Sequence, residues 1–108
     1  MDKETSGKLQ ELQVLEQNLQ AIMMQKQAFQ FELNESVNAS EELGKTKDDV
    51  FKLLGNILIK AGKSEIEKQL KEKVDILSLR LKSIEKQEKS LAEKAEELRQ
   101  AIVGKMQH

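Results

Sequence analysis

The chain has 108 residues, enough for one domain, but only 3% are aromatic and 34% are charged, a composition that is thin for a globular core and typical of long solvated helices. The absence of cysteine excludes disulfides and thiolate metal sites, and 18 basic and 19 acidic residues, interspersed along the chain, leave a net charge of −1. That balance gives no long-range field for nucleic acid or an anionic membrane, and no segment approaches the ~18 apolar residues of a transmembrane helix. We therefore expect a cytoplasmic protein that binds neither nucleic acid nor membrane.

The first predicted element is a helix over residues 4–43. Its apolar residues recur at three- and four-residue steps, so the heptad positions a and d form the seam of a coiled coil. Position a holds Leu12, Leu19, Lys26, Leu33 and Ser40, and position d holds Leu15, Ile22, Phe29, Ser36 and Leu43. The residues assigned off this seam are Leu9, Val14, Met23, Met24 and Phe31. Gly44 follows the last seam residue and predicts the end of the helix.

Residues 50–61 carry the most informative pattern, two five-residue apolar runs around Gly55-Asn56. Both of these residues tolerate positive φ, which suits the two-residue loop of a β-hairpin. The predicted register pairs Leu54 with Ile57. Because strand side chains alternate, both faces become mostly apolar, and the residues expected to join strands of other chains are Val50, Phe51, Leu53, Leu54, Ile57, Leu58 and Ile59. A lone hairpin is marginal in water, so we expect other subunits to cover it.

The second predicted helix spans residues 64–106. Ser64 and Glu67 have the spacing of a capping box at its start. Position d holds Leu70, Leu77, Ile84, Leu91, Leu98 and Lys105, and position a holds Val74, Leu81, Glu88, Ala95 and Ile102. In either plausible antiparallel register, Lys26 and Glu88 lie within about one layer, so pairing and separate extension to water are both open. Two helices of near-equal length around a hairpin predict a single mainly α domain, 1–108, built as a long antiparallel two-helix coiled coil.

Catalytic, cofactor and metal sites are not expected. His108 is the sole histidine, and its place at the terminus indicates a frayed end without a catalytic partner. Residues 39–46 match a loose phosphate-loop pattern, but the stretch ends a predicted helix, and Glu41 and Glu42 stand where phosphate would lie. No nucleophile and base have a recognisable spacing, so we predict that the protein is not an enzyme.

Two blocks of the sequence resemble the prefoldin family, and within it the β-type subunit of the archaeal kind. The more specific block is the hairpin, Val-Phe-Lys-Leu-Leu-Gly-Asn-Ile-Leu-Ile-Lys at residues 50–60. The second runs from Leu70 to Gln87. The resemblance covers nearly the whole chain, and the single hairpin distinguishes it from the α type, which has two.

The resemblance implies an ATP-independent chaperone, or holdase. Two α-type and four β-type subunits, including other copies of this chain, would join their hairpins into an intersubunit β-barrel. The tips of the coiled coils would hold non-native client proteins and deliver them to a group II chaperonin. The tip residues at the two helix termini are Leu9, Leu12, Val14, Leu15, Ile102, Val103 and Met106. For Leu12 and Leu15 the favoured role is to complete the coil. The alternative function is a structural coiled-coil spacer without clients, although a spacer does not need an apolar hairpin.

Overall fold

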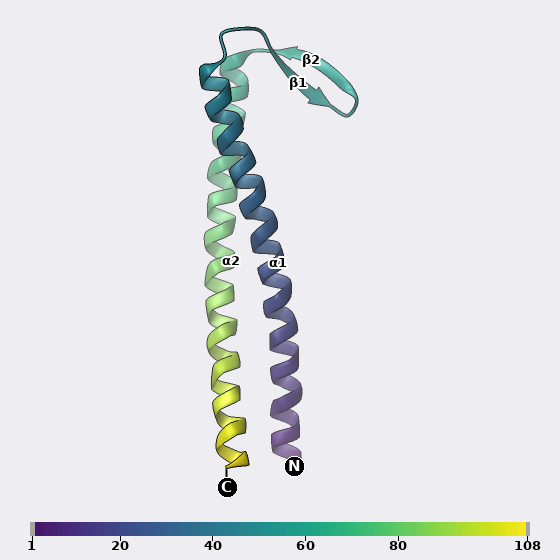
Figure 1. Cartoon of the computed structure of the whole chain (residues 1–108), viewed down its shortest axis with the longest axis vertical. Coiled ribbons are helices and arrows are strands. Elements are labelled where there is room, and N and C mark those ends of the chain that lie inside the picture. The colour runs from purple at the N-terminus through teal and green to yellow at the C-terminus, as the bar shows by residue number, and fades with distance from the viewer. Residues whose placement is uncertain (1, 108) are drawn as a thin grey trace. The chain divides into compact units, whose positions relative to one another are not determined.

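The structure, a computed structural model, describes residues 2–107, which form two helices joined by one β-hairpin (Figure 1). Helix α1 spans Lys3–Lys45, strands β1 and β2 span Val50–Leu54 and Ile57–Ala61, and helix α2 spans Lys63–Met106. This order confirms the predicted mainly α class with a hairpin between long helices. His108 lies outside the described residues, so its interpretation as a frayed end stays a prediction.

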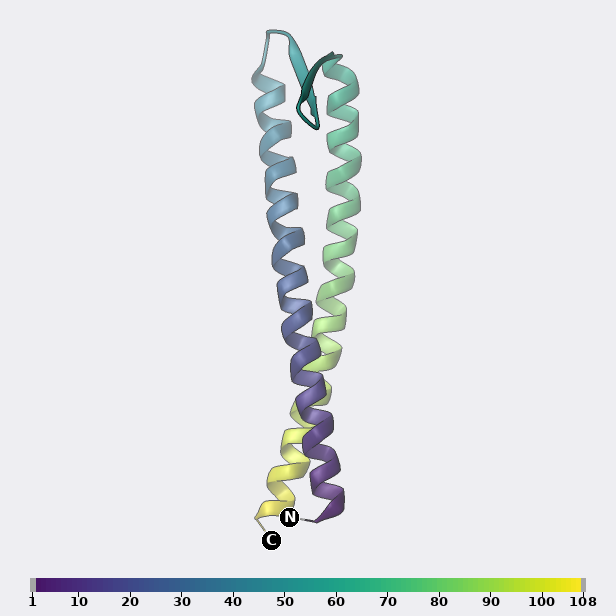
Figure 2. The same cartoon turned by 90° about the vertical axis from the view of Figure 1, so that its right-hand side faces the viewer.

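Contacts divide the chain into two compact units. The terminal unit comprises Met1–Ala28 and Leu81–His108, and the hairpin unit comprises Phe29–Arg80. Within each unit, the α1 and α2 segments run antiparallel (Figure 2). The first and last described turns of the helices therefore meet in the terminal unit, and the hairpin connects the helices in the other.

The seam predicted from the heptads forms the core of the terminal unit. Leu12, Ala95 and Ile102 are buried together there, and the half-buried residues packed against them are Leu9, Leu15, Leu19 and Leu98. Leu9 was placed off the seam and expected to stay exposed, and that expectation was wrong, because it packs against this core. Leu9 follows an a position by four residues, and a side chain beside the seam reaches the core of a two-helix coil.

The hairpin unit continues the same heptad pattern. Leu43 and Leu77, both at d positions, keep only 7% and 3% of their surface exposed. Ser36, also at d, is 4% exposed although it is polar. A small side chain at this position lets the helices approach without an apolar contact, so burial here follows the heptad position more closely than the residue type.

The end of α1 differs from the prediction at Gly44, which is helical rather than a terminating residue. Thr46 caps the last turn instead: its backbone N–H donates to the carbonyl of Leu43 at 3.2 Å, and its hydroxyl donates to the carbonyl of Glu42 at 2.8 Å. These bonds satisfy carbonyls that a helix end leaves without partners. No left-handed glycine is required, so the helix extends to Lys45.

The predicted capping box at the start of α2 was also wrong. The N–H of Ile66 donates to the carbonyl of Gly62 at 3.1 Å, so the helix starts at Lys63 and Ser64 lies inside its first turn. Lys63 is held in place on both sides, because its ammonium donates to the carbonyl of Thr46 at 2.9 Å and lies 4.0 Å from the carboxylate of Glu67. Glu67 thus faces an ammonium group rather than the N–H of Ser64.

The hairpin has the predicted register. Leu54 pairs with Ile57, and Val50 pairs with Ala61. Gly55 has a φ of 62°, in the left-handed region where a side chain is unfavourable. The Gly-Asn pair therefore fixes which strand residues face each other, and with them the composition of each face.

Candidate functional site

Both faces of the hairpin are open to solvent in the single chain. Val50 is half-buried, and the exposed fractions of the other apolar residues are Phe51 54%, Leu53 65%, Leu54 50%, Ile57 65%, Leu58 67% and Ile59 46%. Burial of the exposed part of each side chain would stabilise an assembly by a fraction of the about 1.5–3 kcal/mol that a fully exposed apolar side chain contributes. Such a contiguous apolar surface is a mark of an interaction site in a folded protein.

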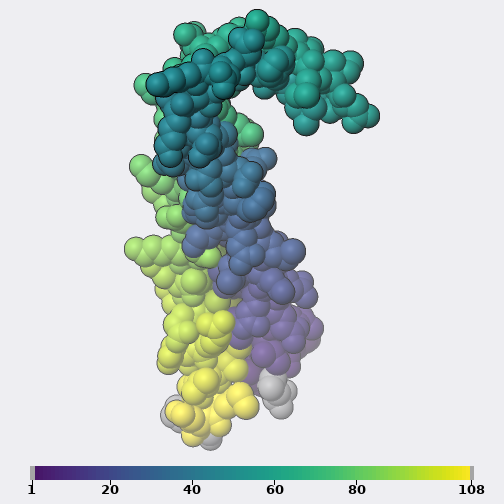
Figure 3. All heavy atoms as spheres, turned by 45° about the horizontal axis from the view of Figure 1, so that its top comes forward, coloured from purple at the N-terminus to yellow at the C-terminus, as the bar shows by residue number. Residues whose placement is uncertain are grey.

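A groove lies between β1 and the adjoining helix ends of the hairpin unit. It has a volume of about 590 Å³, and its apolar lining residues include Leu43, Val50, Phe51, Leu53, Ile66 and Leu70. Figure 3 shows the hairpin projecting away from these helix ends. The ammonium of Lys52 donates to the side-chain carbonyl of Gln69 at 3.3 Å, a tether between β1 and α2. The ammonium of Lys60 on β2 lies 3.5 Å from the carboxylate of Asp49, the residue that precedes β1.

The seven residues predicted at the tip have different environments in the terminal unit. Val14, Val103 and Met106 are exposed, at 54%, 49% and 67%. Leu9 and Leu15 are half-buried, and Leu12 and Ile102 are buried in the core. The first three side chains are available to a partner as the molecule stands, whereas the other four stabilise the coil.

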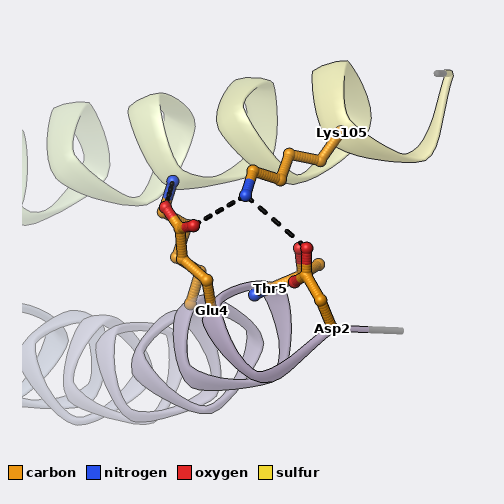
Figure 4. A network of polar contacts seen from close by, with 5 residues as sticks. Asp2, Glu4, Thr5 and Lys105 are labelled. Atoms are coloured by element: carbon orange, nitrogen blue, oxygen red, sulfur yellow. Dashed lines mark hydrogen bonds and ion pairs between the residues drawn. The ribbon is translucent and has the colours of Figure 1, made fainter.

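A polar network that the sequence reasoning missed joins the two helices at the same end (Figure 4). The Lys105 ammonium lies 2.7 Å from the Glu4 carboxylate and 3.6 Å from that of Asp2. Asp2 also caps α1 by accepting the backbone N–H of Thr5 at 2.7 Å. The signal was present, since aspartate before a helical pattern is a common N-cap, but Lys105 was considered only as a seam residue.

The network shifts three pKa values in the directions expected for ion pairs. Hydrogen bonds from the side chain and backbone of Thr5 lower the pKa of Asp2. The hydrogen bond from Lys105 lowers the pKa of Glu4, and the same bond raises the pKa of Lys105. The charged forms of all three groups therefore stabilise the contact between the two helices at this end.

Lys26 and Glu88 form an ion pair inside the terminal unit, with the ammonium 3.0 Å from the carboxylate oxygen. Their side chains are 37% and 26% exposed, so the pair is partly shielded from water. This contact decides the question that the sequence left open in favour of pairing. Both residues stand at a positions, so the pair fills a seam layer in which neither helix supplies an apolar side chain.

Residues 2–107 contain no group of three or more His, Cys, Asp or Glu side chains placed to hold a metal ion. Over the same range, neither helix has a stretch both long and apolar enough to cross a membrane. The candidate functional surfaces are therefore the apolar hairpin, the groove beside it and the exposed residues of the terminal unit.

Comparison with known proteins bears on these surfaces. Residues 6–108 match the family described as Prefoldin subunit. The chain belongs to this family. Among its relatives, Prefoldin subunit beta of Thermococcus onnurineus is 41% identical over 96 residues, covering 87% of this chain and 83% of the relative. Prefoldin subunit beta of Pyrococcus furiosus is 40% identical over 96 residues, with coverages of 87% and 82%.

A solved structure gives the same result for the fold. The crystal structure of the prefoldin beta subunit from Thermococcus strain KS-1 matches with a TM-score of 0.87 at 35% identity, covering 94% of this chain and 90% of that one. The recognition of the prefoldin β type from the hairpin and second-helix residues is thus confirmed. Prefoldin subunits form a chaperone family rather than an enzyme family, and beta subunits form hetero-oligomers with other prefoldin subunits.

Proposed function

We propose that this chain is the β-type subunit of a cytoplasmic holdase that works without ATP. It assembles with α-type subunits in an α2β4 hexamer, binds non-native client proteins at the exposed end of the terminal unit, and delivers them to a group II chaperonin. The observation that carries the proposal is the hairpin, whose apolar side chains from Phe51 to Ile59 are about half exposed or more on both faces of the single chain. A chain of this kind requires partner strands, and prefoldin subunits supply them.

The client contact is assigned to the exposed apolar residues at the ends of the helices. Val103 and Met106 lie on the last turns of α2, and Val14 lies on α1 in the same unit. One such end offers few apolar contacts, so each binds weakly. Several ends that act on one client raise the avidity without any new kind of contact.

The test replaces Val103 and Met106 together by serine and measures suppression of aggregation of an unfolded client. The matched control is Leu79→Ser, because Leu79 is 68% exposed and Met106 is 67% exposed, but Leu79 lies on α2 in the hairpin unit. We expect the double variant to assemble normally and to protect the client poorly, whereas the control protects like the original chain. Full protection by the double variant would contradict the assignment and favour another binding surface.

A further inference from the structure

The outward face of α1 in the terminal unit is unusual in a chain so rich in charge. Opposite a seam at a and d, the positions b, c and f point to solvent. Between residues 13 and 28 these positions hold Gln13, Val14, Gln17, Gln20, Ala21, Met24, Gln27 and Ala28. All eight are exposed, and none is charged. We call this set the neutral face.

The two charges that α1 does carry between residues 13 and 28 are engaged with α2. The carboxylate of Glu16 lies 3.1 Å from the guanidinium of Arg99, and the ammonium of Lys26 lies 3.0 Å from Glu88. Neither one adds an unpaired charge beside the neutral face. A contact on this face therefore does not have to remove an ionised side chain from water, which is the largest cost of covering an ordinary helix surface.

The opposite helix shows that the pattern is not a general property of the chain. The corresponding outward positions of α2 in the same unit are Lys82, Ser83, Lys86, Lys89, Ser90, Glu93, Glu96 and Glu97. Six of these eight are charged, as is typical of a solvated coiled-coil surface. Both helices pack against the same core and face the same solvent, so neither one explains why the outward positions of α1 alone lack charge.

We propose that the neutral face, which shares Val14 with the client contact proposed above, is a second binding surface for non-native polypeptide, specific for apolar segments without charge; this rests on the proposed holdase function. Met24, which is 66% exposed and has the small residues Ala21 and Ala28 as helix-surface neighbours, supplies a flexible apolar contact. The flanking glutamines offer amide donors and acceptors to the unpaired backbone of an unfolded chain. An ionised client segment finds no opposite charge here and loses its hydration on contact.

The size of the face argues against a stable contact between two copies of this chain. Its apolar side chains are one valine, one methionine and two alanines. A stable protein interface covers about 800 Å² and about 20–30 residues on each partner, whereas the neutral face has eight residues. A weak contact that repeats along a flexible polypeptide fits the face better.

The test places a photo-reactive phenylalanine analogue, one position at a time, at Met24, Lys86 or Val103 of the full chain assembled with an α-type subunit. The probe is citrate synthase unfolded in urea and diluted into the mixture. Position 86 is the matched control, since it is an exposed outward position on α2 of the same unit. Position 103 reports on the helix ends.

We expect client cross-links at position 24 about tenfold above those at position 86, the scale set by one buried apolar side chain. Equal yields at 24 and 86, or cross-links from 24 to another copy of the chain without client, would overturn the inference. Cross-links at 103 alone would overturn it and leave the proposed function standing, whereas silence at all three positions would refute both.

A second measurement uses Met24→Lys, which introduces a charge at an exposed position and leaves the core intact. Affinity for the same probe should fall about tenfold, while Lys86→Met should leave it unchanged. Helical circular dichroism verifies that both variants are folded. An affinity for Met24→Lys equal to that of the original chain would contradict a role for this face.

Discussion

We predict that the ion pair between Lys26 and Glu88 fixes the alignment of the two helices. We consider Lys26→Met and Glu88→Gln, which remove the charges with little change of shape, and the double variant. At 3.0 Å, two unit charges attract by a little over 1 kcal/mol in bulk water and several-fold more at a protein surface. Because the side chains are 37% and 26% exposed, and ordering them costs entropy, most of that attraction is offset. We expect a coupling free energy of about 1 kcal/mol.

The assay is a double-mutant cycle on the free energy of unfolding, at one fixed protein concentration because assembly contributes to stability. Each single variant leaves one partly buried charge without its partner, so the two losses should sum to more than the loss in the double variant. Glu16 and Arg99 provide the control, a cross-helix pair at 3.1 Å whose side chains are 48% and 45% exposed. Its coupling should be smaller. Additive effects of Lys26→Met and Glu88→Gln would refute the claim that this pair fixes the alignment.

Three further predictions concern the core, the turn and the terminal network. Ala95 is fully buried, so Ala95→Leu should overfill the core and lower the free energy of unfolding by about 1–3 kcal/mol, measured by thermal or denaturant unfolding. Gly55 has a φ of 62°, so Gly55→Val should destabilise the hairpin by about 1–2 kcal/mol, even though no atom lies within 4 Å of the position of an added Cβ. Gly55→Asn should destabilise it less, and amide hydrogen exchange in the strands measures both effects. Folding lowers the pKa values of Asp2 and Glu4, so their contribution to stability is complete above the ordinary carboxyl pKa of about 4 and is lost as pH falls through the lowered values. Folding raises the pKa of Lys105, so its contribution to stability is lost only as pH rises through a value above about 10. The backbone amide resonance of Thr5 should move in the acidic range, and an unchanged resonance there would contradict the cap.

The parts of the fold that depend on local patterns were predictable from sequence. A Gly-Asn pair between alternating strands allows one hairpin register, and that register is the one observed. The heptads likewise identified the buried core, because a and d positions face the partner helix whichever residue occupies them. Even Ser36, polar and predicted at d, is buried.

The parts that depend on how distant segments meet could not be fixed in advance. Lys26 and Glu88 are 62 positions apart in sequence, so their pairing requires an alignment of the two helices that no local pattern specifies. The contact of Lys105 with Glu4 requires the same alignment at the helix ends. The predicted helix boundaries were wrong for a different reason. Thr46 and Gly62 make the hydrogen bonds that end α1 and begin α2, and several residues of a connecting segment can make such bonds.

The environments of the predicted tip residues show a further limit. The heptads distinguish Leu12 and Ile102, which pack, from Val103 and Met106, which do not, and the structure agrees with that division. Leu9 is the exception, because a position beside the seam can be covered or open depending on the crossing of the helices.

The most direct test of the central claim, that the hairpin is the assembly surface, is native mass spectrometry of the chain mixed with an α-type prefoldin subunit. Leu54→Lys places an ammonium in the face expected to be buried, which should cost several kcal/mol per subunit. Leu79→Lys is the control, because Leu79 is also an exposed leucine but lies on α2, outside both strands. We predict a hexamer with two α-type subunits for the original chain and for Leu79→Lys, and unassembled chains for Leu54→Lys. A hexamer of undiminished abundance with Leu54→Lys would contradict the account.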